Sequence, residues 1–420
     1  MGARFKTALK TLSDFEWLDG ERALVYSRIL IGVTFAAALA WIALSPGGLD
    51  RKGTPIGADF VGFYTASRLA LVGRPDLAYD VSAHWAAQKA LFGAKVGYTA
   101  FFYPPTCLLL CLPLALGSYF SSLAAWLATT GYAYYRVLRG YWLGLGPASL
   151  LAFPAVFVNA AHGQNGFLSA ALIGGGLLVM DRRPALAGLL FGAMAFKPHL
   201  ALMLPFALVF ARRWTTLAVA ATATGGFCAL SFLVFGAPAW NGFFADSAFA
   251  RSALENNLVG NEKMQSVFAA VRLAHGSLGL AWGLQGAAAL GAVAALFSLQ
   301  RFAFRAPGEA PAVVCAGLLA TPFLLDYDLT LLAIPLAWLL GEGLRAGFLP
   351  FEKALLTMAF LLPLVSRVAA GALGLPLAPL TIIAILALTM RRAISPAAGA
   401  GRPVVRAGTT AVPLTLAQQE

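Results

Sequence analysis

Residues 24–45 read LVYSRILIGVTFAAALAWIALS, an apolar run whose one charged side chain is Arg28. A helix needs about 20 predominantly apolar residues to cross a bilayer. This run is too long, and too far from residue 1, to be the apolar core of a cleaved signal peptide. It therefore predicts a retained membrane helix.

The composition extends this prediction to the whole chain. Of its 420 residues 60% are hydrophobic and 11% charged, with a mean hydropathy of +0.76. Soluble domains have about 25% charged residues, so we expect an all-α polytopic integral membrane protein. The net charge of +12 is spread in small clusters between apolar runs, which is typical of topology determinants rather than of nucleic-acid binding. No phosphate-binding glycine loop of the P-loop or dinucleotide type occurs, which argues against a nucleotide-driven pump.

The apolar runs predict about twelve crossings. The second run is long enough to break, and Pro113 with Gly117 marks the break. The two runs that flank Pro198 are short, which places their junction below the membrane surface. The runs lie near 24–45, 104–138, 147–162, 166–180, 184–197, 199–211, 215–236, 279–300, 310–325, 327–344, 351–370 and 374–390.

Basic residues mark every second junction, which orients the chain. The protein is then expected in the cytoplasmic (inner) membrane, with both termini on the cytoplasmic side. The membrane domain spans 1–392, with long outer loops at about 46–103 and 237–277, and 393–420 is a disordered cytoplasmic tail. The basic junctions contain Arg136 and Arg139, Arg182 and Arg183, Arg212 and Arg213, Arg301 and Arg305, Arg345 and Lys353, and Arg391 and Arg392.

The opposite junctions contain the unusual polar residues. They are the loop with Asp59, "AHGQNG" at 161–166, "FKPH" at 196–199, the 237–277 loop and "LLDYD" at 324–328. Charged residues at membrane depth usually face a water-filled cavity or a substrate. We therefore expect a convergent polar cavity on the periplasmic or extracellular face. The four cysteines all lie in apolar stretches, where they are read as small core residues.

Five stretches together resemble glycosyltransferase family 87 (DUF2029), and they occur in that family's order. They are "GADFVGFYTASRLALVGRPDLAYD" (57–80), "FFYPPTCLLLCLPLALGSY" (101–119), "HGQNGFLSAALIGGGLL" (162–178), "RRPALAGLLFGAMAFKPHLALMLPFAL" (182–208) and "LLDYDLTLL" (324–332). The resemblance implies a GT-C-fold enzyme that uses a polyprenyl-phosphate sugar as its donor and binds no nucleotide. It also implies that a carboxylate in the first outer loop is the general base, and Asp59 occupies that position.

The chemistry of the reaction agrees with a carboxylate at Asp59. A hydroxyl that attacks an anomeric carbon must lose a proton, which a carboxylate can accept. A second interpretation, compatible with the first, makes Asp59 the N-cap of a helix that begins near Phe60. That helix is predicted to be amphipathic and to lie at the membrane interface, with Tyr64 and Arg68 as substrate-binding candidates. Arg68 serves equally well as a headgroup anchor.

Lys197 and His199 are further substrate-binding candidates. A lysine next to a proline at the end of a short membrane helix should meet an anion. The donor phosphate and interfacial lipid phosphates are both open as that anion. His162 and Gln164 form a polar turn that would hydrogen-bond sugar hydroxyls, although a simple helix–helix turn remains open.

Asp326 and Asp328 form a DxD pair, which suggests carbohydrate or helix-terminus hydrogen bonds. Their oxygen atoms would also suit magnesium or manganese, but no other acid lies nearby in the sequence. We therefore predict no metal site and no cofactor other than the donor lipid, and leave a divalent metal as the alternative.

The function expected from these features is transfer of a hexose, mannose above all, to a hydroxyl of a glycolipid or polysaccharide. The partners are then the donor, the acceptor and membrane lipids, and not nucleic acid. The alternative is a transporter or flippase of a lipid-linked sugar. Transporters often show repeated halves and binding sites at mid-membrane. The absence of a visible repeat and the gathering of polar residues at one face favour the enzyme.

Overall fold

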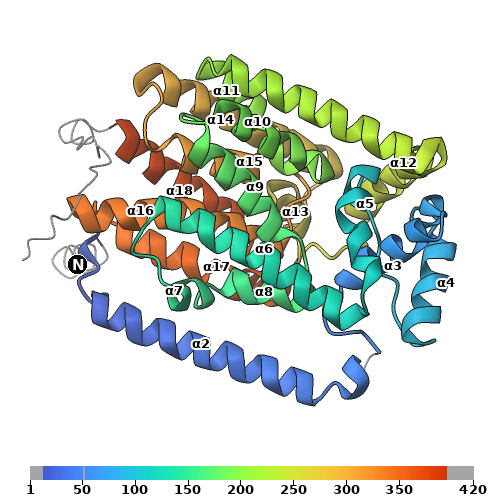
Figure 1. Ribbon diagram of the computed structural model, residues 1–420. Coiled ribbons are helices and arrows are strands. Elements are labelled where there is room, and N and C mark those ends of the chain that lie inside the picture. The colour runs from blue at the N-terminus through green and yellow to red at the C-terminus, as the bar shows by residue number, and fades with distance from the viewer. Residues whose placement is uncertain (1–12, 51–52, 395–420) are drawn as a thin grey trace, which may run out of the picture.

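The computed structural model describes residues 13–50 and 53–394, and over these residues every regular element is a helix (Figure 1). The helices are α2 (Gly20–Ala43), η1 (Pro46–Gly48), α3 (Phe60–Leu71), η2 (Pro75–Ala78), α4 (Val81–Phe92), α5 (Pro105–Cys111), η3 (Leu112–Leu116), α6 (Tyr119–Tyr141), α7 (Pro147–Leu151), α8 (Pro154–His162), α9 (Gly166–Val179), α10 (Pro184–Ala193), η4 (Met194–Phe196), η5 (Pro198–Ala201), α11 (Leu204–Phe210), α12 (Trp214–Glu255), α13 (Val267–Leu273), α14 (Leu278–Phe302), α15 (Glu309–Ala320), η6 (Asp326–Leu332), α16 (Ala333–Ala346), α17 (Glu352–Leu373) and α18 (Leu377–Ile394).

Six of these segments are long and apolar enough to cross a membrane, by length and composition. They are Gly20–Ala43, Trp214–Glu255, Leu278–Phe302, Asp326–Ala346, Glu352–Leu373 and Leu377–Ile394. Other apolar helices are shorter; the 14 residues of α9 reach about 21 Å at 1.5 Å per residue, less than the hydrocarbon thickness of about 30 Å. The all-α membrane class is confirmed, whereas twelve crossings and the GT-C fold remain predictions.

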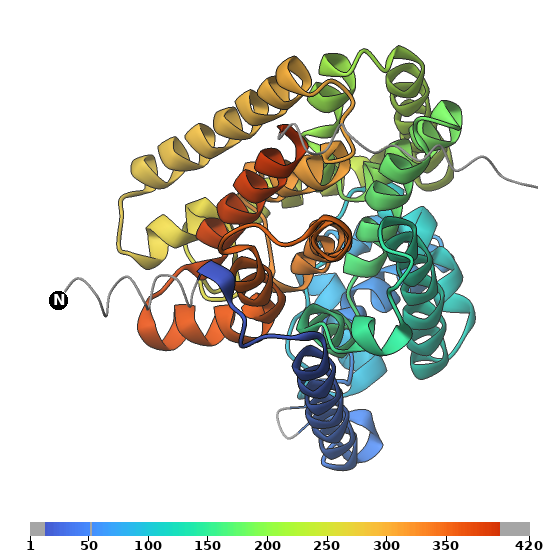
Figure 2. The ribbon, with the colours of Figure 1, turned by 90° about the vertical axis from the view of Figure 1, so that its left-hand side faces the viewer.

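The first predicted span, α2, lies along one side of the bundle (Figures 1 and 2). None of its residues is buried, and Ile29, Val33 and Phe35 are among its exposed apolar side chains. Such a surface is costly in water and favourable in lipid. The exposure of α2 therefore supports its assignment to the membrane.

The basic junctions converge at one end of the bundle. The Arg213 guanidinium forms ion pairs with Asp181 and with Glu309 (2.8 Å), and Arg392 pairs with Glu352. The polar junctions predicted for the other face make their contacts among themselves instead, as described below. These contacts agree with the alternation of basic and polar junctions, while the side of the membrane that each set faces remains a prediction.

Two loop predictions need correction. The segment 237–277 is not a long loop, because α12 continues to Glu255 after a sharp turn at Gly236, where φ is +73°. Pro238 follows this turn, at the start of the second helical segment, where a proline costs no helical hydrogen bond. At the other end of the chain, α18 extends to Ile394, two residues into the predicted tail; residues 395–420 lie outside the described residues.

The break in the second apolar run is confirmed. Helix α5 gives way to the short η3, which contains Pro113, and α6 begins only after Gly117. Ser118 caps α6 by accepting a hydrogen bond from the Ser121 amide. This break places the α5–η3 segment against α3.

Helix α3 is not an interfacial amphipathic helix. Its residues Phe60–Ser67 are all buried, so this part of the helix packs inside the protein on every side. Gly62 allows the close approach, since a Cβ atom there would lie 3.0 Å from the carbonyl oxygen of Ala100. The Ser67 hydroxyl donates to backbone carbonyls of Phe63 and Cys111. The start of α3, with Asp59, is thereby held in a rigid setting.

Candidate active site

The turn between α8 and α9 is the centre of the site. Helix α8 ends at His162, and Gly163 follows in the left-handed conformation with φ +66°. The side-chain oxygen of Asn159 accepts a hydrogen bond from the Gly166 amide at 2.8 Å, which closes the turn where α9 begins. Gln164 and Asn165, the two residues between these glycines, are both buried.

Gly166→Ala should destabilise the protein, because a Cβ atom at this position would lie 2.6 Å from Asn159 Oδ1, Thr330 Oγ1 and Tyr327 O. Overpacking of this kind typically costs about 1–3 kcal/mol. Gly225→Ala in α12 is the matched control, since nothing lies within 4 Å of a Cβ atom there. Thermal unfolding of the purified proteins in detergent measures the difference. A Gly166→Ala variant that melts like the Gly225→Ala variant would contradict the tight packing of this turn.

Asp59 is fixed against this turn at two points. Its backbone amide donates to the carbonyl of His162 at 3.0 Å, and its Oδ2 accepts a hydrogen bond from Gln164 Nε2 at 3.0 Å. The carboxylate makes no capping bond to α3, so the structure gives no support to the N-cap interpretation of this side chain. Among the described residues, Oδ1 has no hydrogen-bond donor and no basic group forms an ion pair with Asp59.

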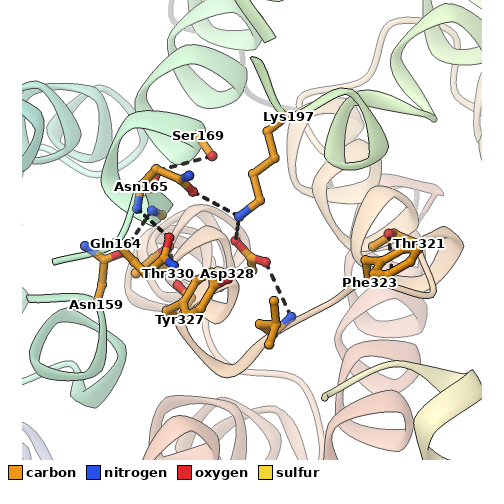
Figure 3. A network of polar contacts seen from close by, with 12 residues as sticks. Asn159, Gln164, Asn165, Ser169, Lys197, Thr321, Phe323, Tyr327, Asp328 and Thr330 are labelled. Atoms are coloured by element: carbon orange, nitrogen blue, oxygen red, sulfur yellow. Dashed lines mark hydrogen bonds and ion pairs between the residues drawn. The ribbon is translucent and has the colours of Figure 1, made fainter. Parts of the chain in front are cut away.

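Lys197 enters the cluster from the junction of η4 and η5 (Figure 3). Its ammonium donates to Asp328 Oδ1 at 2.6 Å and to Asn165 Oδ1 at 2.9 Å, and it lies 4.9 Å from the centre of the Tyr327 ring. Lys197 is only 2% exposed and Asp328 is fully buried. The predicted anion next to Lys197 is therefore present, but in this structure it is Asp328 and not a lipid phosphate.

The two carboxylates of the DxD pair point to different partners. Asp328 holds Lys197, and its other oxygen accepts from the Leu325 amide at 3.4 Å. Asp326 lies 3.7 Å from the guanidinium of Arg367 on α17. Among residues 13–50 and 53–394 no three His, Cys, Asp or Glu side chains form a group suited to a metal.

Three of the predicted substrate-binding residues form no hydrogen bond with this cluster. The Tyr64 hydroxyl donates to the carbonyl of Gly117, and Arg68 donates to the carbonyl of Ala115. The Nε2 atom of His199 is buried without a hydrogen-bond partner, and its ring lies 6.3 Å from that of Phe323. His162 is closer to the cluster, since its ring centre is 6.4 Å from that of Tyr327.

The polar residues come together as predicted, but their side chains pack against one another instead of lining an open cavity. Gln164, Asn165, Lys197 and Asp328 are all buried, and Lys197 donates to both Asn165 Oδ1 and Asp328 Oδ1, while Asn165 Nδ2 is left without a hydrogen-bond partner (Figure 3). Asp59 is only half-buried. It is therefore the acid of the cluster that an incoming substrate can reach with the least rearrangement.

Comparison with known proteins identifies the family of this chain. The model of glycosyltransferase family 87 matches residues 101–325, which is more than half of the chain. The chain belongs to glycosyltransferase family 87. No curated protein and no solved structure matches it. Family membership together with the apolar helices makes this protein a membrane glycosyltransferase. The matched range contains the 162–166 turn and Lys197, whereas Asp59, Asp326 and Asp328 lie outside it.

Two residues of this glycosyltransferase site were not predicted. The Tyr103 hydroxyl donates to Gln164 Oε1 at 3.3 Å, and Arg367 lies 3.7 Å from Asp326. Asn165 belongs to the polar turn that the sequence indicates, and its side-chain oxygen accepts from Lys197. An arginine inside an apolar run is the signal that marks Arg367, because such residues in membrane helices are usually functional. Nothing in the sequence distinguishes Tyr103 from an ordinary interfacial tyrosine.

Proposed function

We propose that this glycosyltransferase moves a mannosyl unit from a polyprenyl-phosphate donor to a hydroxyl group of a glycolipid or glycan acceptor. The proposed location is the non-cytoplasmic face of the cytoplasmic membrane. Family membership supports the reaction class. The observation that supports the mechanism best is the half-buried Asp59 carboxylate, which has one hydrogen-bonded oxygen and no cationic partner among the described residues.

In the proposed reaction Asp59 is the general base. The acceptor oxygen forms a bond to the anomeric carbon while Asp59 takes the proton of the acceptor hydroxyl. The bond from the anomeric carbon to the phosphate oxygen breaks, and its electron pair leaves with the prenyl phosphate. The other two acids of the cluster are less suited to this role, because Asp328 is paired with Lys197 and Asp326 lies beside Arg367.

Gln164 is proposed to orient the base. Its Nε2 donates to Asp59 Oδ2, while its Oε1 accepts from Tyr103 and from the Asn165 amide. The amide is therefore held in one orientation, with N–H toward the carboxylate. Oδ1 of Asp59 is left to accept the proton, since no described residue donates to it.

The donor class is tested with the purified enzyme in detergent. We expect mannose to be transferred from a prenyl-phosphate mannose, no transfer from GDP-mannose, and unchanged turnover after a chelator is added. Transfer from GDP-mannose alone would contradict the lipid donor. Loss of turnover on chelation, with recovery on addition of manganese, would contradict the metal-free mechanism and make Asp326 and Asp328 the metal ligands to test.

A further inference from the structure

Tyr103 lies in a segment whose conformation is restricted by the sequence that follows it. Pro104 and Pro105 come next, and a residue that precedes a proline is largely confined to extended conformations. Pro104 is the N-cap residue of α5, and Pro105 is the first residue of that helix, where a proline is well tolerated. The Thr106 hydroxyl then donates to the carbonyl of Ala195 at 2.9 Å. The backbone at Tyr103 is therefore restricted by the two prolines and anchored by the residue after them.

The Tyr103 ring packs against the helix that begins after Asp59. Its centre lies 5.1 Å from the ring centre of Phe63, one turn along α3 from Asp59, and 5.6 Å from that of Phe101. Phe63 and Phe101 are both buried, and their own ring centres are 6.1 Å apart. Aromatic contacts in a closely packed interior hold each ring in place. Tyr103 and Asp59 thus belong to one rigid unit built on α3.

The hydroxyl of Tyr103 connects this unit to Gln164. It donates to Gln164 Oε1 at 3.3 Å, and the other end of the same amide, Nε2, donates to Asp59 Oδ2 at 3.0 Å. The Asn165 amide also donates to Oε1, at 3.2 Å, but it belongs to the residue next to Gln164 and moves with it. Among the described residues, Tyr103 is therefore the donor to Oε1 that fixes Gln164 relative to Asp59.

These contacts select one orientation of the Gln164 amide. With the amide turned over, its oxygen would face the Asp59 carboxylate and its NH2 group would face the N–H of Asn165, so that like groups would meet. In the observed orientation Oδ2 of Asp59 is held, whereas Oδ1 has no donor among the described residues. A general base must lie within hydrogen-bond reach of the proton that it removes. A carboxylate that is free to rotate would therefore be a poorer base.

We propose that Tyr103 is a positioning residue for the general base: it fixes the Gln164 amide, and the fixed amide holds the Asp59 carboxylate with Oδ1 toward the acceptor. This inference rests on the proposed role of Asp59, and it assigns a role to the Tyr-Pro-Pro sequence at 103–105. Tyr103 acts through Gln164 and not through contact with the donor or the acceptor.

Tyr103→Phe keeps the ring and removes the hydroxyl. In steady-state transfer by the full-length protein in nanodiscs, with prenyl-phosphate mannose as donor, kcat should fall about 3- to 10-fold, the rate equivalent of one hydrogen bond. The KM values for donor and acceptor should be unchanged, because Tyr103 contacts neither. A raised KM with an unchanged kcat would overturn the inference and make Tyr103 a substrate-binding residue.

Tyr141→Phe is the matched control. Its hydroxyl donates to the carbonyl of Gly174 at 2.7 Å, so this variant also loses one bond from a tyrosine to a backbone carbonyl or amide oxygen. Gly174 lies eight residues along α9 from Gly166, or about 12 Å at 1.5 Å per residue. Tyr141→Phe should keep the wild-type kcat, and a Tyr103→Phe protein that is no slower than this control would overturn the inference.

The double variant Tyr103→Phe/Gln164→Met tests whether Tyr103 acts through the amide. Methionine has a similar length but can neither accept from Tyr103 nor donate to Asp59. In the Gln164→Met protein, Tyr103→Phe should therefore change kcat by less than about twofold, because the two residues act in one network. A further 3- to 10-fold fall, about the same as in the wild-type background, would overturn the path through Gln164.

A measurement without turnover uses protein labelled with ¹⁵N-glutamine. The side-chain NH2 resonances of Gln164, assigned by their loss in Gln164→Met, should shift in Tyr103→Phe and stay in place in Tyr141→Phe. Unchanged resonances in Tyr103→Phe would overturn the inference. This readout is separate from the fate of the general base: a shift in Tyr103→Phe, combined with wild-type transfer by Asp59→Asn, would show that the role of Asp59 is wrong and that the fixed amide is not.

Discussion

Replacing Lys197 by methionine should destabilise this protein by about 3–5 kcal/mol, the usual cost of leaving one member of a buried ion pair without its partner. The Lys197 ammonium and Asp328 Oδ1 lie 2.6 Å apart, and both side chains are almost completely buried. Methionine fills a similar volume but leaves the Asp328 carboxylate without a counter-ion. The Lys197→Met protein should therefore melt at a clearly lower temperature in detergent, or fail to be recovered folded.

The double variant Lys197→Met/Asp328→Leu separates the ion pair from packing. With both charges removed, most of the lost stability should return, because paired buried charges replaced by apolar groups are often neutral. Asp328→Leu alone should be about as harmful as Lys197→Met, since it leaves a buried ammonium. A Lys197→Met variant with wild-type stability would contradict the ion pair and reopen the interpretation of Lys197 as a free phosphate ligand.

Local sequence signals predicted much of the helical layout. Pro113 and Gly117 end one helix and begin the next, and both effects act within a few residues of the chain. The short helices around Pro198 were likewise predicted from the lengths of the apolar runs. The helical extension from Gly236 to Glu255 was missed because a glycine and a proline close together suggest a loop, whereas here they only redirect the helix.

The partners within the site were not predictable in the same way. Lys197 and Asp328 are 131 residues apart in the sequence, and Asp59 and Gln164 are 105 apart. The sequence indicates that each is a polar residue at the end of an apolar run, but not which of them neutralise one another. That distinction matters for the proposed chemistry, because it leaves Asp59 as the acid of the cluster with no cationic partner among the described residues and makes Lys197 a poor candidate for binding the donor.

Asp59→Asn should reduce the transfer rate by about 10²–10⁴-fold, the usual effect of losing a general base. Asparagine has nearly the same shape, and its side-chain oxygen can still accept the hydrogen bond from Gln164 Nε2. Because the aspartate side chain does not cap α3, the substitution removes no helix cap. The variant should therefore fold and bind donor lipid like wild type.

Asp76→Asn is the matched control for Asp59→Asn. Asp76 is another acid between the first two predicted spans, and its hydrogen bond from Arg74 lowers the pKa of its carboxyl group, so that it is ionised at neutral pH. This substitution removes the same charge from the protein but not from the cluster around the 162–166 turn. Its transfer rate should stay within a factor of about two of wild type, as expected for a surface substitution away from the site.

The most direct measurement is a single-turnover transfer assay in which wild type and Asp59→Asn are both saturated with prenyl-phosphate mannose and supplied with the same acceptor. Saturation removes differences in donor binding, so the observed rate reports the sugar-transfer step. We expect the Asp59→Asn rate to fall by at least about 100-fold while the amount of bound donor is unchanged. Transfer by the folded Asp59→Asn protein at the wild-type rate would contradict the assignment of Asp59 as the general base.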